Sequence, residues 1–193
     1  MPAFRRLCAR RFQCLPDEDL VTDPILREAT EADIPALSAL GRDSFVDKFG
    51  YMYKPEDLAA FIAQTHSHEA VAGELAHPER RYCLVESDGA LAGYCKLAVP
   101  STLGEFHAAA RPIEIKQLYT APGMTGKGIG AALMDWAMAE ARAHRADVIQ
   151  LSVWSGNDGA QRFYARYGFV KVADITFEVG EQIDEEYLFA LKL

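Results

Sequence analysis

The segment most able to carry chemistry is a glycine-rich stretch that follows an apolar strand pattern and precedes a helical one. Within it, Gly126, Gly128 and Gly130 alternate with Lys127 and Ile129. Glycines leave backbone N–H groups uncovered, and at the beginning of a helix those groups attract anions such as phosphate. The stretch therefore predicts a phosphate cradle, although a plain tight turn could use the same glycines.

Two other phosphate-binding patterns fit this stretch poorly. A Walker A loop requires Lys followed by Ser or Thr, whereas Lys127 is followed by Gly128. The dinucleotide pattern GxGxxG/A does match Gly126–Ala131, but it should follow its strand immediately, and an acid should end the next strand. Here residues 121–125 intervene, and the next predicted strand ends at Val153 without an acid. A dinucleotide-binding fold is therefore the runner-up.

The strand pattern before the glycines changes phase partway along. Ile113 and Ile115 keep the two-residue alternation of a strand, but the next apolar residue is Leu118. One extra residue near Lys116 and Gln117 would restore the alternation, which predicts a β-bulge there. A bulge bends its strand and could open a slot for an extended ligand. An irregular edge strand is the alternative.

A second motif lies further along the chain. After an apolar strand pattern come Asn157, Ala160, the pair Phe163–Tyr164 and the closing pair Gly168–Phe169. The two motifs, in this order, resemble the GNAT superfamily of N-acetyltransferases, whose acetyl-CoA loop has the pattern Gln/Arg-x-x-Gly-x-Gly/Ala. Thr125 stands at the Gln/Arg position, which departs from the family pattern. Because that loop works mainly through backbone amides, the departure should weaken cofactor binding rather than abolish it.

Finer features are similar to the PaiA-type bacterial polyamine acetyltransferases. They lie in three stretches, Phe45–Leu58, Gly93–Leu97 and Phe177–Leu188. The resemblance implies an α/β (mixed α+β) GNAT fold, in which a central mixed, mostly antiparallel sheet is splayed between its fourth and fifth strands and flanked by helices. It covers residues 25–193, which we expect to form one acetyltransferase domain. Residues 1–24 would be a flexible N-terminal extension.

The resemblance also implies that acetyl-CoA binds as a cosubstrate, with its diphosphate at the glycine loop and its pantetheine arm in the splay. The residues expected to contact it are Leu118, Tyr119, Thr120, Thr125, Gly126, Lys127, Gly128, Ile129, Gly130, Ala131, Asn157 and Phe163. No metal is expected. His66 and His68 form a His-x-His pair, but on a helix the two side chains would point apart, and no third ligand is evident.

Two residues are candidates for the chemistry of acetyl transfer. An alkylammonium has a pKa of about 10 and must lose a proton before its nitrogen can attack a thioester. The resemblance implies that Glu114, eleven residues before Thr125, is the base and that Tyr164 donates a proton to the departing thiolate. Alternatively, Glu114 is a solvent-facing acid paired with Lys116, Tyr164 is a core residue, and Asn157 only caps a helix.

The acceptor suggested by the resemblance is a primary amine, with a polyamine or another small amine as the leading candidate. An acidic group near the end of the chain could attract such a cation; its members are Glu178, Glu181, Asp184, Glu185 and Glu186. Acetylation of a protein N-terminus or lysine is one alternative function. A non-catalytic module that binds acyl-CoA for regulation is the other.

Composition sets broad limits on the chain. Its 193 residues, half of them apolar, suit one globular domain. The net charge of −8 argues against a nucleic-acid partner, and the lack of a long apolar run argues against a membrane partner. Four cysteines without CxxC spacing are typical of reduced thiols, so we expect a cytoplasmic protein, with a homodimer left open.

The order of expected elements is strand, helices, β-hairpin, strand, helix, strand, helix and two strands. The expected strands span residues 25–28, 82–86, 91–99, 112–120, 148–153, 169–172 and 187–193. The expected helices begin after Thr30 and Pro55 and span residues 68–76, 126–144 and 160–167.

Overall fold

A computed structural model describes residues 25–104 and 109–193. The predicted N-terminal extension, residues 1–24, lies outside the described residues. The helices are α1 (Ile34–Phe49), α2 (Pro55–His66), α3 (His68–Ala76), α4 (Ile129–Ala143) and α5 (Asp158–Arg166), with short 3-10 turns η1 (Glu31–Asp33) and η2 (Gly50–Met52). The strands are β1 (Ile25–Glu28), β2 (Arg80–Ser87), β3 (Ala90–Ala98), β4 (Pro112–Thr120), β5 (Val148–Trp154), β6 (Val170–Val179) and β7 (Gln182–Lys192).

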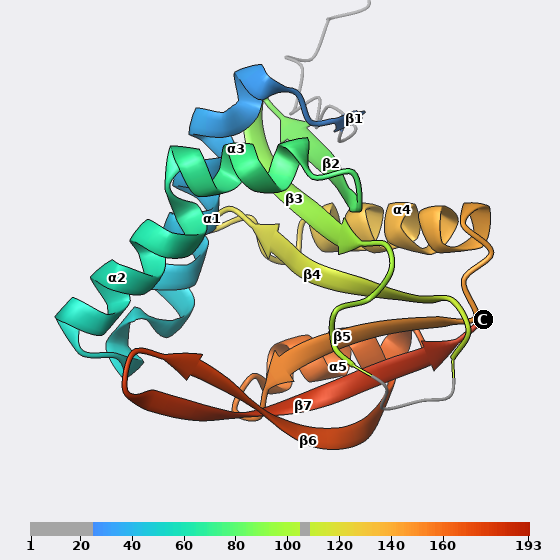
Figure 1. Cartoon of the computed structure of the whole chain (residues 1–193). Coiled ribbons are helices and arrows are strands. Elements are labelled where there is room, and N and C mark those ends of the chain that lie inside the picture. Colours follow the sequence, from blue (N-terminus) through green and yellow to red (C-terminus); the bar gives the residue numbers. More distant parts are fainter. Residues whose placement is uncertain (1–24, 105–108) are drawn as a thin grey trace, which may run out of the picture.

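The strands form one sheet in the order β1-β2-β3-β4-β5-β7-β6. Among the described residues, β4 and β5 make its one parallel pair, and the other neighbours are antiparallel. Helices cover both faces: α1, α2 and α3 lie together on one side, and α4 and α5 pass behind the strands (Figure 1). The predicted fold class, a mixed and mostly antiparallel sheet flanked by helices, is confirmed.

Each face of the sheet has its own apolar core. On one face, Leu133 and Ala137 of α4 belong to a buried cluster with Ile113 and Ile149 of the strands. On the other, a smaller cluster joins α1 and α3 to β2 and β3, and its buried members are Leu37, Leu40, Val71, Tyr82, Leu84 and Tyr94. Burial of apolar surface stabilises a fold by about 25 cal/mol per Å². Because both faces of the sheet bury such surface, the sheet is held between the two groups of helices.

The predicted bulge and splay are both present in β4. Its register with β3 pairs Ile115 with Leu97 and Gln117 with Lys96, so Lys116 is the extra residue. On its other side, β4 pairs with β5 only through Pro112–Glu114, although both strands continue beyond that point. A bulge increases local bend and twist, which accounts for the separation of the two strands after their third pair.

Several expected element boundaries are wrong. Helix α4 begins at Ile129, not at residue 126, because Gly126 and Gly128 have φ angles of +84° and +83°, outside the helical region. The last two strands are longer than expected, because acidic residues interrupt the apolar pattern without interrupting the pairing of β6 with β7. The longer strands form a hairpin that extends toward α2 (Figure 1).

Candidate active site

The glycine-rich loop leads directly into α4 and leaves the beginning of that helix open. Gly128 is the residue before the helix, no side chain of residues 25–104 or 109–193 caps the N-terminus, and the first turn contains no acid. A Cβ atom added at Gly126 or Gly128 would meet nothing within 4 Å, so the loop borders open space. Uncapped N–H groups at a helix N-terminus are an anion site, and these residues therefore fit a phosphate-bearing ligand such as CoA.

Most of the other residues predicted to contact the cofactor lie around this loop. Leu118, Tyr119 and Thr120 occupy the part of β4 that is not paired with β5. Phe163 of α5 lies close to the beginning of α4, since its ring would be 3.7 Å from a Cβ atom on Gly130. The structure thus brings the loop, the free edge of β4 and one face of α5 together.

Asn157 and Lys127 have contacts of their own in the structure. The side chain of Asn157 caps α5 by accepting a hydrogen bond from the N–H of Ala160 at 3.3 Å. The capping role that the sequence left open is therefore present. Lys127 is exposed, and its Nζ lies 3.4 Å from the sulfur of Met124. The roles of both residues toward a cofactor stay predictions.

Tyr164 lies on α5 and faces the sheet. Its side chain is 9% exposed, and its ring packs against those of Phe163 and Phe169 at centroid distances of 5.4 and 5.9 Å. Burial raises the pKa of its hydroxyl well above the usual value, with smaller contributions from Cys95 and Tyr119. At neutral pH the phenol keeps its proton, so it can act as a donor.

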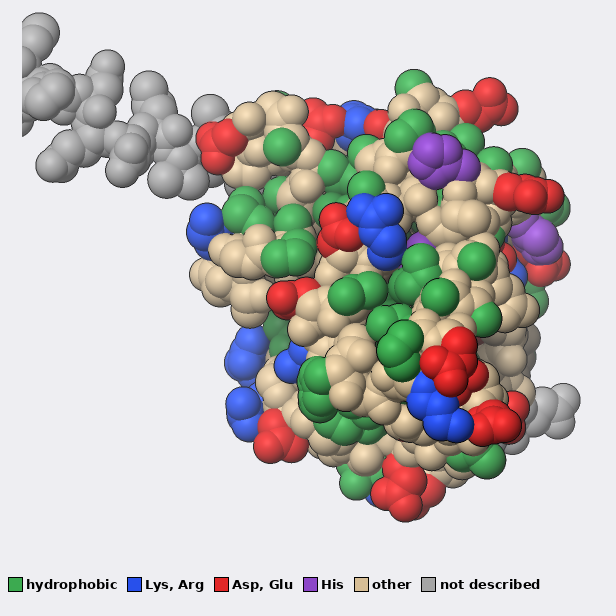
Figure 2. Space-filling model, turned by 90° about the vertical axis from the view of Figure 1, so that its left-hand side faces the viewer, with side chains coloured by type: hydrophobic (Ala, Val, Ile, Leu, Met, Phe, Trp, Pro, Cys, Tyr) green, Lys and Arg blue, Asp and Glu red, His purple; other side chains and the backbone are tan. Residues whose placement is uncertain are grey.

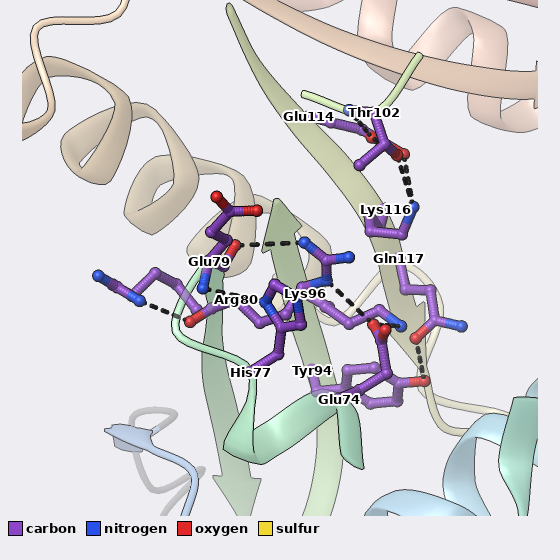
Figure 3. A network of polar contacts seen from close by, with 11 residues as sticks. Glu74, His77, Glu79, Arg80, Tyr94, Lys96, Thr102, Glu114, Lys116 and Gln117 are labelled. Atoms are coloured by element: carbon purple, nitrogen blue, oxygen red, sulfur yellow. Dashed lines mark hydrogen bonds and ion pairs between the residues drawn. The ribbon is translucent and has the colours of Figure 1, made fainter. Parts of the chain in front are cut away.

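Glu114 lies at the last position where β4 pairs with β5, and its carboxylate is already engaged (Figure 3). Its Oε2 accepts hydrogen bonds from the N–H and the hydroxyl of Thr102, at 2.8 and 2.6 Å, and its Oε1 lies 3.2 Å from Nζ of Lys116. The pairing with Lys116 that the sequence left open is therefore present. The expectation of a solvent-facing acid is wrong, because Glu114 is 4% exposed. Its role as a base stays a prediction.

A pocket lined by aromatic side chains and two carboxylates opens on the sheet face opposite α4 and α5. Its lining residues are Phe45, Phe49, Tyr53, Trp154, Phe177, Asp184 and Glu186. They come from α1, the segment after η2, the end of β5 and the β6–β7 hairpin. The hairpin is held over the pocket by an edge-to-face contact between Phe61 of α2 and Phe177, at 5.7 Å. We name this site the aromatic pocket.

The two carboxylates of the aromatic pocket have different surroundings. Asp184 is buried, with one oxygen accepting a hydrogen bond from the hydroxyl of Tyr53 and the other accepting one from Gln182 at 2.6 Å. Burial raises the pKa of Glu186; a hydrogen bond from Ser152 opposes this effect, and the charge of Asp184 adds to it. Two negative groups beneath aromatic rings favour a cationic ligand.

The structure separates the five acids that the sequence placed in one group. Asp184 and Glu186 line the aromatic pocket, whereas Glu185, between them on β7, is exposed and faces the other way. Glu181 pairs with Lys54 at 2.8 Å, and Glu178 is exposed. On the face that carries α1, α2 and α3, acidic side chains stand apart with basic ones beside several of them (Figure 2). Any attraction for a cation is therefore local to the pocket.

The aromatic pocket itself was not predicted from the sequence as a site. Its rings come from segments more than a hundred residues apart, so no single motif contains them. Two partial signals exist: Phe45 and Phe49 are four residues apart on a helix, and Phe177 alternates with Ile175 and Val179 on a strand. Neither pattern predicts that the phenylalanines of the helix will face Phe177 of the strand.

A second, smaller cavity lies between α1–α3 and the sheet. Burial lowers the pKa of its residue His66 to about 4, and among the described residues the Nε2 atom of that ring has no hydrogen-bond partner. Beside it, the buried Nζ of Lys96 pairs with Glu74 at 2.9 Å (Figure 3).

Nowhere in residues 25–104 and 109–193 do three or more His, Cys, Asp or Glu side chains gather so that they could hold a metal ion. In the same ranges, no helix combines the length and apolarity needed to cross a bilayer.

Comparison with known proteins gives consistent matches. The sequence profile of the acetyltransferase (GNAT) family matches residues 41–169. An uncharacterized N-acetyltransferase of Lactobacillus delbrueckii subsp. lactis is 30% identical over 161 residues, covering 83% of this chain and 92% of the relative. The aminoalkylphosphonate N-acetyltransferase of Salmonella typhimurium is 30% identical over 152 residues, covering 79% and 88%. Among solved structures, the PaiA N-acetyltransferase of Thermoplasma acidophilum in complex with coenzyme A superposes with a TM-score of 0.73 at 19% identity, covering 89% of this chain and all of that one.

Proposed function

Because the chain belongs to the GNAT family of acetyltransferases, we propose that it transfers an acetyl group from acetyl-CoA to a small primary amine, with a polyamine as the leading acceptor. The acetyl-CoA dependence and the N-acetyltransferase activity are those of the family; the acceptor is the new element. We also propose that residues 25–193 form the catalytic domain, with residues 1–24 as an extension. A cytoplasmic location and a homodimer stay predictions.

The cofactor site is proposed on the open glycine loop and the free edge of β4. Acetyl-CoA supplies an acetyl group activated as a thioester. Backbone N–H groups of residues 125–131 would hold the diphosphate, supported by the uncapped beginning of α4. The N–H of Leu118 would hold the thioester carbonyl, and Leu118 and Thr120 the pantetheine amides. The lack of β4–β5 pairing beyond Glu114 supports this assignment.

The chemistry is proposed as a direct attack of the amine, with both substrates bound at once. Tyr164 would donate its proton to the leaving thiolate, because the phenol is protonated at neutral pH and its hydroxyl is unpartnered within the described residues. The two cysteines in the described part of the chain, Cys83 and Cys95, are poor nucleophiles, because both are buried and burial raises the pKa of Cys83 to about 11. The scheme therefore needs a base for the amine but no nucleophile from the chain.

The aromatic pocket is the observation that carries the choice of acceptor. An ammonium group over aromatic faces gains about 0.5–2 kcal/mol, and the adjacent carboxylates add a Coulomb attraction. Trp154, at the end of β5, places the pocket beside the splay where the thioester would lie. One relative is named for acetylating aminoalkylphosphonates, which are small molecules with an amino group on an alkyl chain.

An acceptor screen with a pocket variant tests this proposal. Spermidine, an aminoalkylphosphonate, a lysine peptide and a peptide with a free N-terminal alanine would each be offered with acetyl-CoA, and the release of free thiol would be measured. We expect the small amines to be acetylated faster than the peptides. Trp154→Ala should raise the KM for the amine about tenfold through the loss of one cation–π contact, with the KM for acetyl-CoA unchanged.

Tyr51→Ala is the matched control, because Tyr51 is also aromatic but is 77% exposed and outside the pocket. It should leave both KM values as they are. Faster acetylation of the peptides would contradict a small-amine acceptor and favour protein acetylation. Binding of CoA without turnover of any amine would favour the regulatory module instead.

A further inference from the structure

We infer that Glu186, at the base of the aromatic pocket, takes the proton from the acceptor's ammonium, while Asp184 beside it serves as a fixed counter-charge; this inference rests on the proposed function. The motif resemblance pointed to Glu114 for the same task. The contacts of the three carboxylates, taken one at a time, favour Glu186.

Glu114 is poorly placed to receive a further proton donor. Both of its oxygens are occupied, one by the two Thr102 donors and the other by Lys116. These contacts tie the segment after β3 to strand β4, which is a structural task. These contacts leave at most one of the four lone-pair positions of the carboxylate for a further donor, and the Lys116 ammonium beside it would repel a second ammonium.

Asp184 is fixed in a similar way inside the pocket. The hydroxyl of Tyr53 and the side-chain amide of Gln182 each occupy one of its oxygens. Because both donors are neutral, the negative charge of Asp184 is not compensated by a salt bridge in the described part of the chain. Asp184 can therefore attract an ammonium group, while its two hydrogen bonds hold the carboxylate in place.

Glu186 is the carboxylate that remains partly open. It is half-buried, lies opposite Trp154 of β5 and Ile175 of β6, and has the hydroxyl of Ser152 as its one hydrogen-bond partner within the described residues. The titratable groups that face it are Asp184 on the same strand, Tyr53 after η2 and Tyr119 on β4. Its charge contributes to the raised pKa of Tyr119, which in turn contributes to that of Tyr164. Because Glu186 pairs with Trp154 at the end of β5, it lies in the part of the sheet beyond the last β4–β5 pair, which is the splay where the thioester is proposed to lie.

The different environments of the two pocket carboxylates suit them to different roles, Glu186 as the base and Asp184 as the counter-charge. A base is most effective when its pKa lies close to the working pH, and burial together with a neighbouring charge moves Glu186 in that direction. In the step we infer, one N–H proton of the ammonium passes to Glu186 and leaves a neutral amine. As the nitrogen–carbon bond forms and the carbon–sulfur bond breaks, the sulfur takes the proton of Tyr164. The second proton lost by the nitrogen restores Tyr164, and Glu186 releases its proton to solvent.

The test is Glu186→Gln, which keeps the size of the side chain and removes its basicity. At pH 7 with spermidine, kcat/KM for the amine should fall about a hundredfold, at the lower end of the usual contribution of a general base because water can substitute in part. The KM for acetyl-CoA should not change. Wild-type activity should level off above the raised pKa of Glu186, whereas the residual activity of the variant should keep rising with pH, as more amine is deprotonated in solution.

Three further variants make the result specific. Glu185→Gln removes the same charge from the neighbouring, outward-facing position and should keep activity within twofold. Glu186→Asp retains a carboxylate and should recover part of the lost rate and the levelling of the pH profile. Glu114→Gln should destabilise the segment after β3 and lower the melting temperature, without changing the shape of the pH profile.

The outcomes separate this inference from the proposed function. If the wild type acetylates no small amine, the proposed function fails before the variants are needed. If the wild type acetylates spermidine but Glu186→Gln keeps its rate and Glu114→Gln changes the pH profile, only the inference is overturned. Equal losses in Glu185→Gln and Glu186→Gln would also overturn it, because the effect would then be one of net charge alone.

Discussion

Gly128→Val is expected to weaken CoA binding at least about a hundredfold, or roughly 2.7 kcal/mol. Gly128 has a φ of +83°, which a β-branched residue resists. A valine would therefore either strain the loop or turn its N–H groups away from the beginning of α4. Its side chain would also project into the open space beside the loop, where the structure has no atom within 4 Å. Calorimetric titration with CoA measures the change directly.

Gly89→Val provides the matched control for this prediction. Gly89 lies in the β2–β3 hairpin with a φ of +75°, and a Cβ atom there also meets open space. The control therefore carries a similar backbone cost at a place remote from the cofactor. It should lower the melting temperature by a similar amount and leave CoA affinity unchanged. Equal CoA affinity in the two variants would remove the glycine loop from the cofactor site.

Tyr164→Phe is expected to lower kcat about a hundredfold while the KM for acetyl-CoA changes less than threefold. The hydroxyl is the one group removed, and its proton would otherwise offset the charge of the leaving thiolate, a contribution of about 10²–10⁴ for a well-placed acid. The ring would still fill its place against Phe163 and Phe169, so the fold should be unaffected. Steady-state kinetics with saturating amine measures both constants.

Tyr167→Phe on the same helix is the control for the loss of a phenol. Tyr167 packs against Phe163 with ring centroids 5.2 Å apart, but it is more exposed than Tyr164. Its kcat should stay within twofold of the wild type. An unchanged kcat in Tyr164→Phe would take Tyr164 out of the chemistry, and the thiolate would then have to be stabilised by the N–H groups of β4.

The features that sequence predicted well are those encoded by neighbours along the chain. The phase slip between Ile115 and Leu118 gave the bulge at Lys116, because the side-chain period of a strand is fixed at two. The alternating glycines gave an open loop, because uncovered N–H groups and positive φ angles follow from the lack of a side chain. These local rules, with the second motif, were enough to indicate the family and the fold.

The features that sequence missed depend on how distant segments dock. The aromatic pocket requires the β6–β7 hairpin to reach α2, where Phe177 meets Phe61, and no local pattern specifies that contact. The burial of Glu114 is also a tertiary effect, since Thr102 comes from a loop without regular structure. A run of acids near the end of the chain concealed both the length of the hairpin and the inward orientation of Asp184 and Glu186.

We propose that the glycine loop and the aromatic pocket are two ends of one site, joined where β4 and β5 separate. The most direct test is the affinity of a conjugate in which spermidine is linked through an acetyl bridge to the sulfur of CoA. We expect the conjugate to bind at least tenfold more tightly than CoA alone, and Gly128→Val and Trp154→Ala each to remove part of that affinity. A conjugate that binds no more tightly than CoA, or that is insensitive to Trp154→Ala, would contradict it.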